Sequence, residues 1–247
     1  VPHHLLDVLD PTERFSAGSF ARRAGTVLDE LERRGKPAIV VGGSGLYLRA
    51  LLDGLAEMPA PDPAVREELS ARWRVEGLTG LLAELRRVDP VTAARLAPGD
   101  KQRILRALEV ARSTGCPLSV WLSRPTSRPR WTALRVGLTL PRRLLYDRIG
   151  SRVLRMIEAG WLDEVRGLLA AGVEPTAPAF QAIGYADWIR HLAGEIDFDT
   201  AVRRIGVATR RFAKRQETWF RRDPDIEWRD ARRQVGWASE IAGRLEE

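Results

Sequence analysis

The sequence predicts an α/β fold in which helices cover both faces of a parallel sheet. Two short apolar runs, Pro37–Val41 and Ala133–Leu140, have the composition and boundaries of strands. The first run is apolar on both faces, which is typical of a strand buried in a parallel sheet. Most of the remaining chain has the spacing of amphipathic helices, which would cover such a sheet.

The helices can be placed by their apolar period and by the residues that begin and end them. A helix is expected from Ser16 to Arg34, with Ser16 as its cap and Gly35 as its stop. The turn Gly42-Gly43-Ser44-Gly45 follows the first predicted strand and leads into another apolar helical pattern. Later helices are expected at Leu144–Ile157, Leu162–Ala171 and Asp199–Arg222.

Residues 57–130 form a proline-bounded stretch that is helical throughout in its pattern. Helix starts are expected near Asp62-Pro63 and Asp89-Pro90. Because a predicted strand lies on either side, we interpret 57–130 as a helical insertion. Residues 1–56 and 131–247 then form one discontinuous α/β core.

The composition limits the class of protein. No apolar run is long enough to span a bilayer and no signal peptide is recognisable, so a cytoplasmic protein without membrane contact is expected. Cys116 is the only cysteine, which excludes an internal disulfide, and no zinc site is recognisable. The net charge of +7 suggests a polyanionic partner, although genome composition could equally favour the many arginines.

Cations gather on one side of the predicted helix Asp199–Arg222. At about 100° per residue, eight basic side chains fall on two adjacent stripes, and Ile205, Ala208, Phe212 and Trp219 fall on another arc. A solvated basic face is the ordinary alternative. Eight like charges repel one another, however, and a phosphate backbone would neutralise them. The eight are Arg203, Arg204, Arg210, Arg211, Lys214, Arg215, Arg221 and Arg222.

Two smaller features are compatible with anion binding. Arg103 and Arg106 lie three residues apart on one face of a predicted helix. The amides of the turn Gly42–Gly45 could meet an anion, although a plain strand-to-helix turn explains the glycines nearly as well. No Walker A spacing of glycine to lysine occurs in the 247 residues.

Taken in order, several segments resemble the tRNA dimethylallyltransferase family. The resemblance runs almost from end to end of the chain. It rests on Val1-Pro2-His3-His4-Leu5-Leu6-Asp7, Pro37–Tyr47, Asp89-Pro90 with Ala93-Ala94, Asp100–Val110, Ala182-Ile183-Gly184-Tyr185 and Thr209–Arg221.

The resemblance implies a fold, a reaction and partners. The fold would be a P-loop-kinase-like parallel sheet, flanked by helices, with a helical insertion that contacts tRNA. The reaction would transfer a dimethylallyl group from dimethylallyl diphosphate to N6 of the adenosine 3′ of the anticodon, with Mg²⁺ assisting departure of the diphosphate. The adenosine of the anticodon stem-loop would have to flip out of its stack. A monomer is expected.

The resemblance also assigns roles to residues of this chain. Ser44 matches a threonine that the family has in this turn, and serine keeps the hydroxyl group, which is expected near the reacting amine. Gly42 and Gly43 would lie near the diphosphate. The residues that match tRNA contacts are Arg66, Gln102, Arg103, Arg106, Arg210, Arg211, Lys214 and Arg215.

The family's Walker A loop and an Asp-Ser segment with the general base are expected before Val1. The first strand, the phosphate loop and most Mg²⁺ ligands would then lie outside these 247 residues. We therefore expect this stretch alone to be inactive and poorly soluble. The beginning at Val1 instead of methionine also favours a truncated chain.

Two alternatives stay open. Adenylate isopentenyltransferases act on a free nucleotide, and nucleotide kinases share the core, but neither needs the insertion and the cationic helix. A noncatalytic RNA-binding remnant is the other alternative, and the codons upstream of Val1 would decide it. Core positions are the preferred interpretation for Trp161, Trp188 and Trp219, as is structural packing for His3 and His4.

Overall fold

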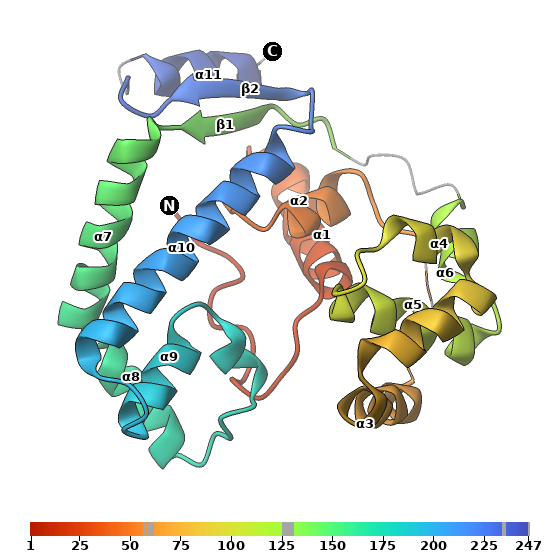
Figure 1. Ribbon diagram of the computed structural model, residues 1–247. Helices are drawn as coiled ribbons and strands as arrows, with labels where there is room; N and C mark the ends of the chain where they lie inside the picture. Colours follow the sequence, from red (N-terminus) through yellow and green to blue (C-terminus); the bar gives the residue numbers. More distant parts are fainter. Residues whose placement is uncertain (57, 59–61, 125–130, 234–235, 247) are drawn as a thin grey trace. The chain divides into compact units, whose positions relative to one another are not determined.

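A computed structural model describes residues 1–56, 58, 62–124, 131–233 and 236–246 (Figure 1). The chain divides into two compact units, which are described separately below. Unit 1 consists of Val1–Leu52 and Trp131–Glu247, and unit 2 consists of Asp53–Arg130.

Unit 1 is mostly helical and has a small sheet at one end (Figure 1). Its helices are α1 (Ala17–Arg33), α2 (Gly45–Leu52), α7 (Arg142–Glu158), α8 (Trp161–Ala170), the short 3₁₀ helix η1 (Pro178–Gln181), α9 (Tyr185–Leu192), α10 (Phe198–Phe220) and α11 (Trp237–Glu246). Its strands are β1 (Arg135–Thr139) and β2 (Ile226–Asp230). Every helix predicted for this part is confirmed, with bounds that differ by a few residues.

The two strands pair in parallel, from Arg135 opposite Ile226 to Thr139 opposite Asp230. Strand β1 lies inside the predicted run Ala133–Leu140, whereas β2 was not predicted. The prediction of an α/β fold with a parallel sheet is therefore confirmed at this coarse level, with a sheet of two strands in the described residues.

The predicted buried strand Pro37–Val41 is wrong. Residues 36–42 have no regular secondary structure, and Ile39 and Val41 are 80% and 89% exposed. A strand exists only through pairing, and neither β1 nor β2 pairs with this segment. Its β-branched composition expresses a preference that no described neighbour satisfies.

The core of unit 1 lies among α7, α8, α9 and α10. Trp188, Val165 and Ile205 are fully buried there. Asp197 caps α10 by accepting a hydrogen bond from the Thr200 amide at 2.6 Å, which satisfies one of the free donors of the first turn. Burial of the apolar side of α10 leaves its basic side chains to face outward.

Trp161 and Trp188 are buried, as the sequence predicts, but Trp219 and Phe212 are exposed. Both of these residues lie in the second half of α10, beyond the part that is buried against α7 and α9. The helical period placed them correctly on the apolar arc, but the packing that would cover them ends earlier along the helix.

Helices are the only regular secondary structure among the described residues of unit 2. Its helices are α3 (Pro63–Val88, with a break at Gly77), α4 (Pro90–Arg95), α5 (Lys101–Thr114) and α6 (Leu118–Leu122). Leu69, Leu81, Leu85, Ile104 and Leu108 form its core. Asp62 and Asp89 cap the helices that begin at the two predicted Asp-Pro positions. None of the helices described in either unit is long and apolar enough to cross a membrane.

Candidate nucleic-acid interface

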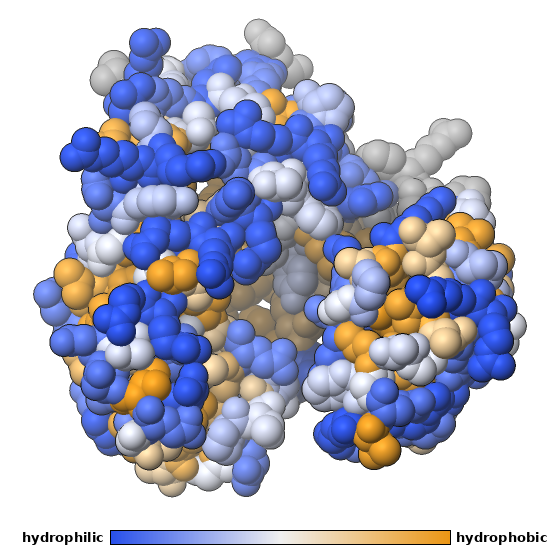
Figure 2. Space-filling model, in the orientation of Figure 1, coloured by the Kyte–Doolittle hydropathy of each residue, from blue (hydrophilic) through white to orange (hydrophobic). Residues whose placement is uncertain are grey.

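The basic side chains of α10 lie largely on the surface. Seven of the eight are exposed, and Arg210 is half-buried. The space-filling view shows a mostly hydrophilic surface where α10 runs (Figure 2). The exposed residues are Arg203, Arg204, Arg211, Lys214, Arg215, Arg221 and Arg222.

Acidic side chains compensate only part of this charge. Arg204 pairs with Asp187 at 2.6 Å, and Arg221 pairs with Glu217 on its own helix at 2.8 Å. Among the described residues, Arg211, Lys214, Arg215 and Arg222 have no ion pair. The surface therefore keeps several cations that an external anion can neutralise.

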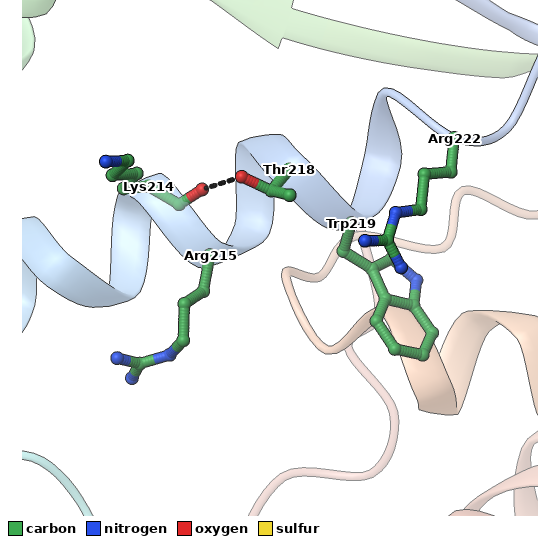
Figure 3. A pocket seen from close by; sticks show the side chains of 5 residues that line it. All are labelled: Lys214, Arg215, Thr218, Trp219 and Arg222. Carbon is green, nitrogen blue, oxygen red and sulfur yellow. Dashed lines mark hydrogen bonds between the residues drawn. The ribbon is translucent and has the colours of Figure 1, made fainter. Parts of the chain in front are cut away.

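Two shallow depressions lie along α10. The first, of about 270 Å³, is lined by Lys214, Arg215, Thr218, Trp219 and Arg222 (Figure 3). The second, of about 370 Å³, lies nearer the start of the helix and is lined by Asp187 of α9 and by Arg203, Arg204, Val207, Ala208 and Arg211. Three of the five residues that line the first depression are cations, and the second is lined by three cations and one aspartate, so both carry a net positive charge that suits an anionic group.

The glycine turn before α2 packs directly against the second half of α10. The side-chain amide of Gln216 donates to the carbonyl oxygen of Gly43 at 3.0 Å. A Cβ atom on Gly45 would lie 2.1 Å from Nε1 of Trp219, so only glycine permits this approach. In Figure 3 the Trp219 ring points away from α10, the guanidinium group of Arg222 overlaps the indole in this view, and Lys214 points to another side of the helix.

Ser44 lies between these two contact points. Its carbonyl oxygen accepts from the amides of Tyr47 and Leu48 at 2.9 and 3.1 Å, which starts helix α2. The side chain is exposed, and its hydroxyl group has no hydrogen bond to a described residue. The hydroxyl is therefore free for an external partner, beside a helix rich in cations. Gly42, in the same turn, has open space around it.

In unit 2, Arg66 of α3 and Arg106 of α5 share one acidic partner. Arg66 Nε lies 2.7 Å from Oε1 of Glu109, and Arg66 Nη2 donates to Oε2 at 3.3 Å. The first of these contacts is an ion pair without hydrogen-bond geometry, since Oε1 accepts no hydrogen bond in the described structure. Arg106 Nη1 donates to Oε2 at 3.0 Å.

The other two predicted contacts of unit 2 lie on the first turn of α5. Gln102 and Arg103 are both exposed, and Arg103 pairs with the cap residue Asp100 at 3.1 Å. Next to them, Lys101 lies over the ring of Trp73, with Nζ 3.0 Å from the centroid. This cation–π contact joins α5 to α3.

Sequence reasoning missed three residues of these sites. Gln216 and Trp219 hold the glycine turn, and neither has a local signal for that role, because their partners are far away in the sequence. Glu109 does have such a signal, since it lies three residues after Arg106 on the same helix. That spacing could have identified the pair.

The chain is similar to known proteins over most of its length. The sequence model of the IPP transferase family matches residues 1–223. The tRNA dimethylallyltransferase of Geobacter metallireducens is 49% identical over 230 residues, which are 92% of this chain and 74% of that protein. The tRNA dimethylallyltransferase of Thermomicrobium roseum is 43% identical over 247 residues, which are 100% of this chain and 74% of that protein.

Solved structures of similar proteins point to the same family and fold. The full-length tRNA isopentenylpyrophosphate transferase of Bacillus halodurans is 34% identical with a TM-score of 0.68, and the match covers 100% of this chain and 79% of that one. A eukaryotic dimethylallyltransferase acting on tRNA has the same fold, with a TM-score of 0.79, 24% identity and coverage of 99% and 63%. The resemblance found in the sequence is thus confirmed, and the chain belongs to the IPP transferase family.

Proposed function

We propose that this chain is a tRNA-modifying prenyltransferase that moves a dimethylallyl group from dimethylallyl diphosphate to N6 of the adenosine 3′ of the anticodon. Family membership supports prenyl transfer to tRNA. The observation that carries the proposal within this structure is the contact of the Ser44 turn with the cationic half of α10. This contact puts a free hydroxyl group beside a surface suited to phosphates.

The reaction requires that N6 attacks the first carbon of the dimethylallyl group. A C–N bond forms, the C–O bond breaks with its electron pair leaving on the diphosphate, and the proton that N6 loses passes to water. The Ser44 hydroxyl can accept a hydrogen bond from the amine or donate one to the leaving oxygen. Because negative charge develops on the leaving diphosphate, nearby cations and amides lower the barrier.

The cations of α10 are proposed to bind the RNA backbone. Arg210, Arg211, Lys214 and Arg215 lie within two turns of the helix, and guanidinium groups bind phosphate oxygens in a bidentate manner. In unit 2, Arg66, Gln102, Arg103 and Arg106 are proposed as further contacts with the tRNA. Residues 57–130 are proposed as the insertion that carries these contacts.

The described residues contain no cluster of ligands for the Mg²⁺ ion that the family resemblance implies. In residues 1–56, 58, 62–124, 131–233 and 236–246, no group of three or more His, Cys, Asp or Glu side chains could hold a metal ion. The steps above therefore use only side chains and amides of this chain.

The test is binding of an anticodon stem-loop at several salt concentrations. We expect the logarithm of affinity to fall steeply with that of salt, because each neutralised phosphate releases counterions. Lys214→Gln and Arg215→Gln should each weaken binding and lower the slope by about one unit. Arg33→Gln, in the last turn of α1 and also exposed, is the matched control and should change neither.

A shallow salt dependence that is the same for all variants would contradict RNA binding by α10. Tight binding of free adenosine monophosphate with the same shallow slope would instead favour a free nucleotide as the acceptor.

A further inference from the structure

Glu109 is the most deeply buried acidic side chain that contacts predicted RNA-binding residues. It is 5% exposed, whereas its partners Arg66 and Arg106 are 42% and 31% exposed. Burial of an ionised carboxylate is costly unless cations compensate it. Here the carboxylate lies below the surface, and the two guanidinium groups lie between it and solvent.

The geometry of the three groups fixes the orientation of both arginines. Arg66 forms an ion pair with Oε1 through Nε and donates to Oε2 through Nη2, and Arg106 donates to Oε2 through Nη1. Both arginines donate to the same oxygen, Oε2. Two long side chains from different helices are thereby held next to each other, although their charges repel.

The triad keeps one net positive charge and free donors. Two guanidinium groups and one carboxylate sum to +1. Each guanidinium carries five N–H donors, and Glu109 occupies only some of them. The remaining donors belong to half-exposed side chains, so a phosphate group can reach them without breaking the contacts with Glu109.

We infer that Glu109 is a positioning residue that holds Arg66 and Arg106 ready for one phosphate group of the RNA backbone. This inference rests on the proposed function, because the phosphate belongs to the tRNA. A disordered arginine must lose side-chain entropy when it binds, and an arginine already held in place loses less.

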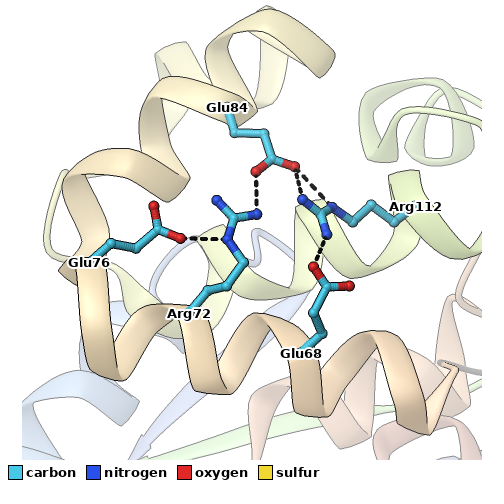
Figure 4. A network of polar contacts seen from close by, with 5 residues as sticks. All are labelled: Glu68, Arg72, Glu76, Glu84 and Arg112. Carbon is cyan, nitrogen blue, oxygen red and sulfur yellow. Dashed lines mark hydrogen bonds and ion pairs between the residues drawn. The ribbon is translucent and has the colours of Figure 1, made fainter.

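A second cluster between the same two helices provides a built-in comparison (Figure 4). Glu84 accepts from Arg72 at 2.7 Å and from Arg112 at 2.6 Å, so it too is a carboxylate shared by two arginines. Arg72 also contacts Glu76, and Arg112 contacts Glu68 at 2.7 Å. The contacts of this cluster join α3 to α5 within unit 2. Its three carboxylates and two arginines sum to a net charge of −1, so the cluster repels phosphate.

The test compares Glu109→Gln with Glu84→Gln in binding of an anticodon stem-loop. Each change removes one negative charge from a carboxylate shared by two arginines. If charge alone mattered, both variants would bind RNA more tightly. We expect Glu109→Gln to bind on the order of tenfold more weakly, because two charge-assisted phosphate contacts lose their orientation. Glu84→Gln should bind as tightly as the unchanged protein or more tightly.

Thermal unfolding of each variant shows whether weaker RNA binding could come from a loss of stability. Both changes should lower the melting temperature, and binding is measured well below it. If Glu109→Gln does not fold, Arg66→Lys serves instead, since it keeps the charge but loses the planar fork. It should also weaken binding, with no change in net charge.

The possible outcomes distinguish failure of the proposed function from failure of the positioning role of Glu109. No binding by the unchanged protein would contradict the proposed function. Binding by the unchanged protein together with equal or tighter binding by folded Glu109→Gln or Arg66→Lys would overturn the positioning role and leave the proposed function intact.

Discussion

Gln216 donates a hydrogen bond to the carbonyl oxygen of Gly43, 173 residues away in the sequence, at 3.0 Å. This bond joins the basic helix α10 to the turn that carries Ser44. Neither residue alone indicates this contact, since one is a glutamine among cations and the other is a glycine in a turn. Together they determine where the Ser44 hydroxyl lies relative to the cations.

Gln216→Ala should loosen the glycine turn without unfolding unit 1. The loss of one half-buried hydrogen bond costs about 1 kcal/mol of the free energy of unfolding. Hydrogen exchange at the amides of Tyr47 and Leu48, which close the first turn of α2, should become faster. Thr218→Ala is the control, because its hydroxyl group bonds only to the Lys214 carbonyl of its own helix. Equal exchange in both variants would contradict the coupling.

Gly45→Ala should displace the indole of Trp219. The added Cβ atom would lie 2.1 Å from Nε1, far inside van der Waals contact, and the ring cannot give way by a small shift. A destabilisation of about 1–3 kcal/mol is expected from such overpacking. The measurement is the indole N–H resonance of Trp219, assigned with Trp219→Phe, together with urea unfolding.

Gly42→Ala provides the matched control in the same turn. No atom lies within 4 Å of a Cβ atom built there. Its indole resonance and its unfolding curve should match those of the unchanged protein. A Trp219 resonance that stays in place in Gly45→Ala would show that the close approach does not exist in solution.

The elements that the sequence predicted well are those with local signals. Helix α1 has its cap at Ser16, and the long helix α10 has both an apolar period and an acidic cap. Such features depend on residues within a few positions of one another. The periodicity of α10 also predicted that its cations face outward.

The strands were harder to predict from the sequence, because pairing joins segments that are far apart along the chain. Strand β2 pairs with β1 across about 90 residues, and its sequence, Ile-Glu-Trp-Arg-Asp, lacks a clear apolar run. Conversely, Pro37–Val41 has the composition of a strand but no partner among the described residues. Composition expresses a preference, and pairing decides whether it is realised.

In the candidate site too, features with a local sequence signal could be predicted, whereas contacts between distant segments could not. The cationic stripes could be read from helical periodicity, and Ser44 and Arg66 were assigned by family resemblance. The contacts that position them depend on how helices pack. Glu109 reaches Arg66 only because α3 and α5 pack together, and Trp219 meets Gly45 only because α10 passes the turn.

Asp89→Asn should destabilise unit 2. The Asp89 carboxylate is buried and accepts from the Thr92 amide at 3.0 Å, the Thr92 hydroxyl at 2.7 Å and the Ser119 amide at 2.9 Å. It therefore caps α4 and ties it to α6. Loss of the charge should cost about 2 kcal/mol at neutral pH, measured by urea unfolding. Asp62→Asn, an exposed cap with one such bond, should cost less.

The cost of Asp89→Asn should depend on pH. Burial would raise the pKa of Asp89, but the hydrogen bonds from Thr92 and Ser119 outweigh it and lower the pKa. The ionised carboxylate therefore stabilises the fold above the unfolded-state pKa of about 3.9, and this contribution disappears as pH falls through the lower folded-state pKa. The difference between the two proteins should shrink in acid. A constant difference would show that the charge contributes nothing.

Tyr185 should ionise at a higher pH than an ordinary tyrosine. Burial raises its pKa to about 12, and a hydrogen bond to Oε1 of Glu164 at 2.6 Å acts in the same direction. Because the folded-state pKa lies above the unfolded value of about 10, the stabilisation is complete below pH 10 and is lost as pH rises toward 12. Phenolate absorbance should show a late step that Tyr185→Phe removes.

Glu164→Gln tests the second cause of this shift, because it removes the negative charge beside the phenol but leaves the burial of Tyr185 intact. The late step should move to lower pH and remain above the ordinary value, since burial is the larger cause. A late step that Glu164→Gln leaves in place would mean that burial alone controls Tyr185.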